Sequence, residues 1–304
     1  MMFRNRTVLW PAVLTLLLLL QGAGCSRPSH EQEEAAFELT DDLGRVVRFE
    51  AAPRRIVSLA PSLTESLFAL GADSLVAGVT SACNYPPRVS GVPVVGDLLT
   101  PNLERILSLD ADLVLISVEG NTQRSFAAME RMGLRLFVSN PRSMEGVCKS
   151  LADLGQLTAR PHRARELVDS LRLLRKQLLA NQPAERPGVL VLVSTQPIMV
   201  AGRETFLDEI IETGGGRNAA AELPGHYPTL SRESVLALDP DVLLFPDDMH
   251  LGVRDLVSRY PEWKEITAVR ERRMHAVNAD MFLRPGPRVF AAAQWLRTVL
   301  HPER

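Results

Sequence analysis

Two glutamates, Glu104 and Glu233, occupy matching places in two similar stretches of this sequence. Residues 103–115 align without a gap with residues 232–244, and each copy holds an acidic residue in the first turn of an expected short helix, an Asp-x-Asp turn and an apolar strand. An acidic side chain at that place stabilises a helix through its dipole, whereas an exposed carboxylate can also pair with an arginine of a partner protein. The two glutamates are therefore predicted to be either helix-end charges or two docking points on two related lobes.

A second candidate site is the loop 280–288, which contains Asp280, Arg284 and a Pro-Gly-Pro run that restricts the backbone. Loops that follow strands are where α/β sheets place their ligands. Arg284 is therefore expected to donate two hydrogen bonds to a carboxylate or phosphate of a ligand. The simpler alternative is a surface ion pair between Asp280 and Arg284, worth under about 1 kcal/mol.

Two further side chains are expected at a ligand cleft. His226 and Tyr227 precede the helix that carries Glu233. An imidazole can ligate a metal centre, but an isolated histidine is more often a solvated side chain. We predict that these residues contact a bound ligand together with Arg284, and we predict no metal site made by the protein alone.

Known catalytic and nucleotide-binding patterns are absent from the sequence. It contains no H-E-x-x-H, C-x-x-C, G-x-S-x-G or G-x-x-x-x-G-K motif. The glycine run at 214–216 follows an expected helix and is best explained as its end. We therefore predict a binding protein with no catalytic residue and no cofactor.

The elements that must position these residues alternate between strands and helices. Strands are predicted at 55–59, 75–79, 92–95, 112–117, 135–138, 189–193, 241–245 and 274–277, and helices at 61–71, 102–109, 125–132, 206–213, 232–238, 266–269 and 288–300. Between the two groups, residues 143–179 are helical, and their second half from Pro161 forms a helix of about five turns. This alternation predicts an α/β protein with two lobes, parallel sheets, one linking helix and a cleft between the lobes.

The beginning of the chain predicts export. Arg4 and Arg6 precede an apolar run at 8–20, which is too short for a comfortable membrane span and ends in small residues before Cys25. This pattern resembles a bacterial lipobox, in which the cysteine is acylated, although Gly22 stands where leucine is usual. An ordinary signal peptide or a short anchor is the alternative. The predicted organisation is a lipoprotein-type signal at 1–24, a tether at 25–36, an N-terminal lobe at 37–160 opening with a hairpin at 37–49, a linking helix at 161–187 and a C-terminal lobe at 188–304.

The composition excludes one class of partner. A net charge of −2, with 46% hydrophobic and 23% charged residues, gives a globular protein without a basic footprint for nucleic acid. Beyond Cys25, the sequence has two cysteines, Cys83 and Cys148, both in the predicted N-terminal lobe. An exported setting permits a disulfide between them, and two free buried thiols are the equal alternative.

An ordered set of short motifs resembles the Fe/B12 periplasmic-binding family across residues 54–300. The motifs are those at 56–65 (IVSLAPSLTE), 85–87 (YPP), 95–97 (VGD), 102–106 (NLERI), 120–121 (GN), 201–202 (AG), 214–215 (GG) and 231–233 (SRE). The resemblance implies a class III periplasmic-binding fold: two three-layer α/β lobes with parallel sheets, joined by one long backbone helix at about 161–181. It further implies the substrate-binding component of an ABC importer.

The same resemblance assigns expected roles to residues. Glu104 and Glu233 match the family's glutamates that meet arginine pockets of the permease dimer. Asp280, Arg284 and Tyr227 match ligand-contacting positions of the family members that bind vitamin B12. Other aromatic cleft positions of those members correspond here to Ala82, Leu98, Ser117 and Met199, and aromatic residues make up only 5% of the chain. The resemblance therefore adds Met199 to the side chains expected to contact the ligand.

The expected ligand is thus a metal chelate, namely a corrinoid, a haem or a ferric siderophore, bound by a monomer that is lipid-anchored and faces the periplasm or cell exterior. A sensor or scavenger outside transport, or less favourably an enzyme on the same scaffold, is the alternative function.

Overall fold

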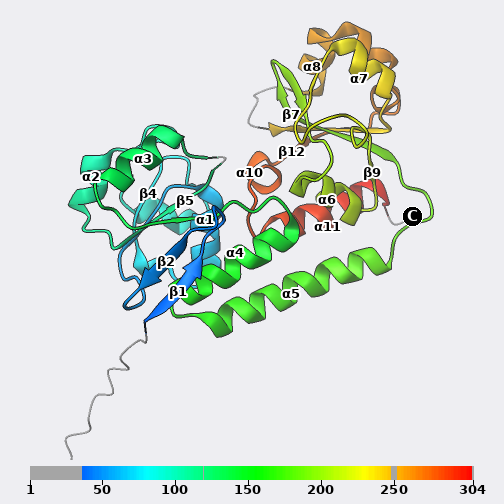
Figure 1. Ribbon diagram of the computed structural model, residues 1–304. Helices are drawn as coiled ribbons and strands as arrows, with labels where there is room; N and C mark the ends of the chain where they lie inside the picture. Colours follow the sequence, from blue (N-terminus) through cyan, green and yellow to red (C-terminus); the bar gives the residue numbers. More distant parts are fainter. Residues whose placement is uncertain (1–35, 119, 248–251, 303–304) are drawn as a thin grey trace, which may run out of the picture. The chain divides into compact units, whose positions relative to one another are not determined.

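The computed structural model describes residues 36–118, 120–247 and 252–302 (Figure 1). The predicted signal, the predicted acylation site at Cys25 and all of the predicted tether except Ala36 lie outside these residues. Residues from Ala36 onward form one compact unit. The predicted lobe boundaries within this unit stay predictions. In the part of the chain that the structure describes, no helix combines the length and apolar character needed to span a membrane.

The first half of this unit contains a hairpin, a parallel sheet and the helices that cover it. Its elements are β1 Phe37–Thr40, β2 Val46–Phe49, β3 Ile56–Ser58, α1 Pro61–Ala69, η1 Asp73–Leu75, β4 Val76–Val79, η2 Pro87–Gly91, α2 Leu103–Ser108, β5 Leu113–Ile116, α3 Gln123–Arg131, β6 Leu136–Val138 and α4 Met144–Leu157. The sheet has the order β4-β3-β5-β6, and all of its pairs are parallel.

Each face of this sheet packs against different helices, as alternating side chains require. On one face, Leu113 and Leu115 of β5 join a cluster with Leu63 of α1 and Leu151 of α4. On the other face, Val114 of β5 joins a second cluster, which includes residues of α2 and α3. The sheet is therefore the middle layer of three.

The hairpin β1–β2 is fixed to the neighbouring sheet by its turn. The buried carboxylate of Asp41 accepts hydrogen bonds from the backbone N–H groups of Leu43 (3.0 Å), Arg45 (3.0 Å) and Val138 (3.3 Å), and it pairs with the Arg45 guanidinium at 2.6 Å. Asp42 accepts a hydrogen bond from the backbone N–H of Asn140 at 2.6 Å. The hairpin predicted at 37–49 is confirmed.

The second half contains a mixed sheet. Its elements are α5 Pro161–Ala180, β7 Gly188–Thr195, β8 Ile198–Val200, α6 Phe206–Thr213, β9 Arg217–Asn218, β10 Thr229–Leu230, α7 Arg232–Leu238, β11 Val242–Pro246, α8 Val253–Arg259, η4 Pro261–Glu265, α9 Thr267–Arg270, β12 Met274–Val277, α10 Ala279–Phe282 and α11 Val289–Leu300. The strand order is β10-β8-β7-β11-β12, with β9 also pairing β7. β7, β11 and β12 pair in parallel as expected. Three short strands were not predicted: β9, which is parallel to β7, and β8 and β10, which are antiparallel additions.

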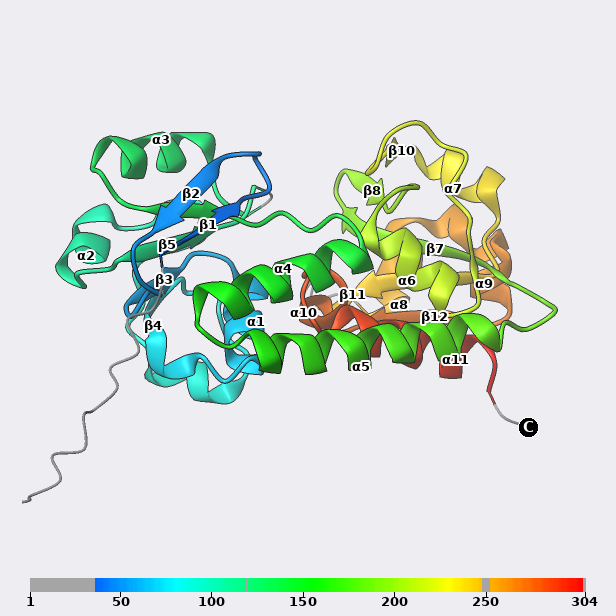
Figure 2. The same ribbon diagram turned by 60° about the horizontal axis from the view of Figure 1, so that its bottom comes forward.

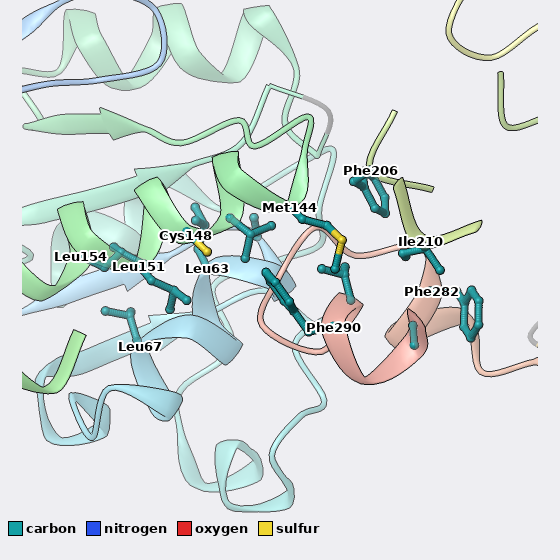
Figure 3. Packing of buried hydrophobic residues seen from close by; sticks show 14 of the residues in the cluster. Leu63, Leu67, Met144, Cys148, Leu151, Leu154, Phe206, Ile210, Phe282 and Phe290 are labelled. Atoms are coloured by element: carbon teal, nitrogen blue, oxygen red, sulfur yellow. The ribbon is translucent and has the colours of Figure 1, made fainter. Parts of the chain in front are cut away.

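Helix α5 connects the two halves (Figure 2). It packs beside α4 near its start and beside α6 and α11 further along. One hydrophobic cluster follows the same path, from Leu67 of α1 through Met144 and Phe290 to Ile210 of α6. Figure 3 shows Met144 and Phe290 between the leucines of α1 and α4 and the side chains of Phe206 and Ile210. The two halves therefore share a hydrophobic core.

The repeated sequence segment forms the same structure twice. In each half, a short helix (α2 or α7) leads into a central strand (β5 or β11). The first aspartate of each Asp-x-Asp turn has a positive φ, 48° at Asp110 and 39° at Asp239. The second aspartate of each turn accepts a backbone hydrogen bond from the beginning of the adjacent strand. Asp112 accepts from the Arg55 N–H, just before β3, at 3.0 Å, and Asp241 accepts from the Gly188 N–H, at the start of β7, at 2.6 Å. The two halves thus contain equivalent helix-strand units.

One predicted strand is wrong. Residues 92–95 form only a single bridge between Val94 and Val79. Pro93 lies within this run and has no N–H to donate to a neighbouring strand. Two hydrogen bonds join the segment to Val79 of β4, from the Val79 N–H to the Pro93 carbonyl at 3.0 Å and from the Val95 N–H to the Val79 carbonyl at 2.8 Å.

Candidate ligand cavity

A cavity of about 260 Å³ lies where several strands end. Its lining residues are Ala60, Pro61, Ser62, Ala82, Leu98, Ser117, Gly120, Ala279, Asp280, Leu283, Arg284 and Pro285. They come from the segments that follow β3, β4 and β5 in the first half and β12 in the second. All four strands run parallel in their sheets, so the cavity lies at their carboxyl ends, the edge at which open α/β sheets bind ligands.

Asn121 holds the first-half wall of the cavity together. Its side-chain amide donates to the carbonyl oxygens of Leu59 (3.1 Å) and Leu98 (2.9 Å), and its side-chain oxygen accepts from the Ser117 N–H at 3.1 Å. One amide therefore connects three segments, all of which carry lining residues.

The loop that carries Leu98 is shaped by Gly96 and Asp97. Gly96 has φ +113°, and a Cβ at this position would lie 2.8 Å from the backbone nitrogen of Asn102, so only glycine fits. The Asp97 carboxylate accepts hydrogen bonds from the Thr100 hydroxyl (2.6 Å), the Thr100 N–H (2.6 Å) and the Leu99 N–H (2.8 Å). These hydrogen bonds, chiefly the one from the Thr100 side chain, hold the pKa of Asp97 below its ordinary value.

Asp280 and Arg284 meet in the second-half wall, and Arg284 has several partners. Its Nη2 pairs with Asp280 and donates to the Ala82 carbonyl at 3.1 Å, while its Nη1 donates to Asn84 (2.8 Å) and to Glu65 (3.1 Å). The Asn84 amide also donates to Asp280 at 2.7 Å. The predicted alternative of an Asp280–Arg284 ion pair is therefore present, but the pair lines the cavity and is bonded to the first half.

Glu65, which sequence reasoning did not select, lies behind this pair. Its side chain is 3% exposed, and it accepts two hydrogen bonds from Arg288, one from Nε at 2.7 Å and one from Nη2 at 2.6 Å. Arg288 also lies over the ring of Tyr85, with its guanidinium carbon 4.1 Å from the ring centroid. A carboxylate on the buried face of α1 is an unusual position that demands a partner, and this local signal was available in the sequence.

The family assignment follows from the sequence as a whole. The profile of the family described as periplasmic binding protein matches residues 56–280. The chain belongs to the periplasmic binding protein family. It is 30% identical over 318 residues to the Bacillus subtilis ABC transporter substrate-binding lipoprotein YvrC, covering 99% of this chain and 98% of that one. It is also 29% identical over 250 residues to the vitamin B12-binding protein of Photorhabdus laumondii, covering 81% and 87%.

Solved structures agree with the assignment. The apo form of the periplasmic heme-binding protein RhuT from Roseiflexus sp. RS-1 aligns with a TM-score of 0.74 and 31% identity, over 82% of this chain and 98% of that one. The class III fold predicted from the sequence is thereby confirmed. These relatives and solved structures are binding proteins rather than enzymes.

Three predicted ligand contacts of this binding protein lie outside the described lining of the cavity. His226 is half-buried, and its Nδ1 lies 3.3 Å from the Arg203 carbonyl. Tyr227 is half-buried and packs against the shared hydrophobic core. Met199 lies in β8 opposite Thr229 of β10. Within the described residues, no group of three or more His, Cys, Asp or Glu side chains is arranged to hold a metal ion.

The predicted docking glutamates of this binding protein are both exposed and both lie in the first turn of a short helix. The helices α2 and α7 are capped by the side chains of Asn102 and Ser231, which accept hydrogen bonds from backbone N–H groups, and not by the two glutamates. The carboxylate of Glu233 also accepts hydrogen bonds from its own N–H and from Ser231, which lower its pKa. No ion pair of Glu104 is found among the described residues.

Cys83 and Cys148 of this binding protein are free and buried. The Cys83 sulfur lies 3.2 Å from the Thr64 hydroxyl and 3.3 Å from the Thr80 hydroxyl. Burial raises the pKa of Cys148 to about 11, with a contribution from the charge of Glu145. The alternative of two free thiols describes this structure.

Proposed function

We propose that this protein captures a metal chelate in the cavity at the carboxyl ends of its strands and delivers it to an ABC importer. The observation that carries the proposal is the cavity itself. Both halves of the chain line it, and the ion pair between Asp280 and Arg284 forms part of its wall. The names of its relatives support the ligand class, because they include vitamin B12-binding and heme-binding proteins.

The dimensions and chemistry of the cavity suggest how such a ligand binds. A volume of about 260 Å³ is slightly below the range usual for sites that enclose a small molecule, roughly 300–1,000 Å³. A corrinoid or porphyrin would therefore insert an edge and leave the rest of the ring in solvent. Ala82, Leu98 and Ser117 line the wall without aromatic rings, so shape and the Asp280–Arg284 pair, rather than ring stacking, would hold the chelate.

A direct titration tests the ligand class. The full chain, purified in detergent, would be titrated with cyanocobalamin, dicyanocobinamide, haemin and a ferric hydroxamate siderophore, with visible absorbance and quenching of tryptophan fluorescence as readouts. We expect saturable one-to-one binding of at least one chelate. Replacing Leu98 with Trp, which would occupy the cavity, should weaken that binding. Absence of binding by all four chelates would refute the proposed ligand class.

The proposed docking to the permease rests on Glu104 and Glu233. In a βα unit the helix runs antiparallel to its strands, so its first turn lies at the carboxyl edge of the sheet. The two exposed glutamates would therefore flank the edge where the cavity opens, and each would pair with an arginine pocket of a permease dimer. Binding to reconstituted permease should be lost in the double variant Glu104→Arg and Glu233→Arg. Glu166→Arg, at an exposed position of α5, is the matched control and should bind the permease as the wild type does.

Cys25 is the proposed attachment point of the lipid. We expect the full chain to incorporate radiolabelled palmitate and to sediment with membranes, facing the periplasm or cell exterior. The variant Cys25→Ser should lose the label. Equal labelling of the variant would contradict acylation at this residue. A protein that docks as a single binding component is expected to be a monomer, which size-exclusion chromatography with light scattering would check.

A further inference from the structure

Four charged side chains surround the Asp280–Arg284 edge of the cavity, and their charges cancel. Asp280 and Arg284 line the cavity, while Glu65 and Arg288 lie directly behind them. The side chains of Glu65, Arg284 and Arg288 are 3%, 16% and 21% exposed, so water screens their charges only partly. Among the described lining residues, no other side chain carries a formal charge.

Glu65 accepts hydrogen bonds from both arginines of the group. Its carboxylate oxygens face guanidinium N–H groups of Arg284 and Arg288, which can only donate hydrogen bonds. Without the negative charge of Glu65, Asp280 alone would face two partly buried arginine cations, and the group would carry a net charge of +1. The negative charge of Glu65 thus makes the four-residue group neutral.

The N–H donors on the two terminal nitrogens of Arg284 are also occupied. Its two terminal nitrogens make hydrogen bonds or ion pairs with Glu65, Asn84, Ala82 and Asp280. A ligand carboxylate would have to displace one of these partners to gain the bidentate contact that an arginine normally offers. Arg284 therefore shapes the cavity edge without presenting a free anion site.

We propose that Glu65 is a specificity-determining residue that sets the cavity edge to zero net charge and so selects against ligands that bring a carboxylate to this edge. The inference rests on the proposed function, since it assumes that chelates bind in this cavity. It adds a criterion within that class: the portion of the chelate that enters is uncharged, as an amide or ester rim would be, rather than an ionised acid. Glu65 acts through Arg284 and Arg288 and is a positioning residue.

Two pairs of probes isolate ligand charge from ligand shape. Cyanocobalamin and its monocarboxylic acid differ by one amide against one carboxylate, and haemin dimethyl ester and haemin differ by two esters against two carboxylates. For each pair, the ratio of dissociation constants of the uncharged and the anionic probe would be measured on the full chain in detergent at neutral pH. Wild-type protein should prefer the uncharged member of whichever pair it binds.

Three variants then change the charge of the edge in known steps. Glu65→Gln makes it +1, Arg288→Gln makes it −1, and the double variant returns it to zero. One unit charge less than about 10 Å from the carboxylate of the probe should change the ratio of the two dissociation constants by about tenfold. We expect a shift toward the anionic probe in Glu65→Gln, a shift away from it in Arg288→Gln, and a ratio within about twofold of wild type in the double variant.

The ratio separates charge selection from a merely structural role. Loss of stability alone would weaken both members of a pair equally, and Arg288→Gln keeps the test available if Glu65→Gln does not fold. Glu166→Gln makes the same substitution at an exposed position of α5 and should leave the ratio of dissociation constants unchanged. An equal ratio in all variants would overturn the inference while leaving chelate binding intact, whereas absence of binding by every probe would overturn the proposed function and the inference with it.

Discussion

Substituting Gly96 with alanine should damage the cavity and destabilise the fold together. The would-be Cβ lies 2.8 Å from the Asn102 nitrogen, 2.9 Å from the Thr100 carbonyl oxygen and 3.0 Å from the Pro101 Cα, all of them backbone atoms. A non-glycine residue at this backbone conformation costs about 1–3 kcal/mol, and forcing the loop aside adds roughly 1–3 kcal/mol. We therefore expect the free energy of unfolding to fall by about 3 kcal/mol.

Gly133→Ala is the matched control for this prediction. Gly133 also has a positive φ, +75°, but a Cβ there would meet no atom within 4 Å, so it should cost only about 1–2 kcal/mol. Urea unfolding of both variants measures the difference, and chelate titration measures the effect on the cavity. Because the Gly96 loop carries Leu98, Gly96→Ala should weaken chelate binding while Gly133→Ala should not. Equal unfolding energies, or unchanged binding in Gly96→Ala, would refute the steric reasoning.

Three further predictions concern single side chains. Asp41→Asn replaces a buried acceptor of Arg45 and backbone donors with an amide and should lower the free energy of unfolding by about 3 kcal/mol in urea; a loss under about 1 kcal/mol would contradict this role. Cys83 and Cys148 are buried, and burial raises the pKa of Cys148 to about 11, so in the Cys25→Ser variant Ellman's reagent should titrate them at pH 8 only after unfolding; rapid reaction of that folded variant would count against it. Arg172 hydrogen bonding lowers the pKa of Glu145 below 4.5, so the stabilisation from this pair is present above pH 4.5 and disappears as the pH falls toward the folded pKa. Both side chains are more than half exposed, so Glu145→Gln should cost less than about 1 kcal/mol at pH 7, and a difference that grows on acidification would contradict the assignment.

Local sequence patterns predicted several helices and strands of the second half to the residue. Helices α6 and α7 and strand β12 begin and end where their apolar periodicity predicted, because a buried face fixes the period of each element. The antiparallel strands β8 and β10 escaped prediction since they have three and two residues. Strands that short carry almost no pattern. β8 forms along the hydrogen-bonding edge of β7, and β10 forms along the edge of β8.

The candidate site was predictable on one side only. Asp280 and Arg284 were found because both lie in the segment between β12 and α11. The sequence predicted only a loop there, whereas Asp280 lies in the short helix α10. Glu65 was missed because its partners, Arg284 and Arg288, lie more than two hundred residues further along the chain, and pairing across that separation leaves no local pattern. The available signal was one acid among Leu63, Leu67 and their buried neighbours on α1.

The cost of burying Glu65 favours a functional explanation for its presence. Removing ions from water is expensive, and replacing a buried ion pair with apolar side chains of similar size is often neutral or stabilising by roughly 1–4 kcal/mol. Stability alone would therefore be served by leucine or methionine at positions 65 and 288. An apolar pair, however, would leave Arg284 without its carboxylate acceptor in the first half of the chain, and the cavity edge would lose the charges that lie behind it. The ion group is thus better explained by the orientation and charge of Arg284 at the ligand cavity than by the stability of the fold.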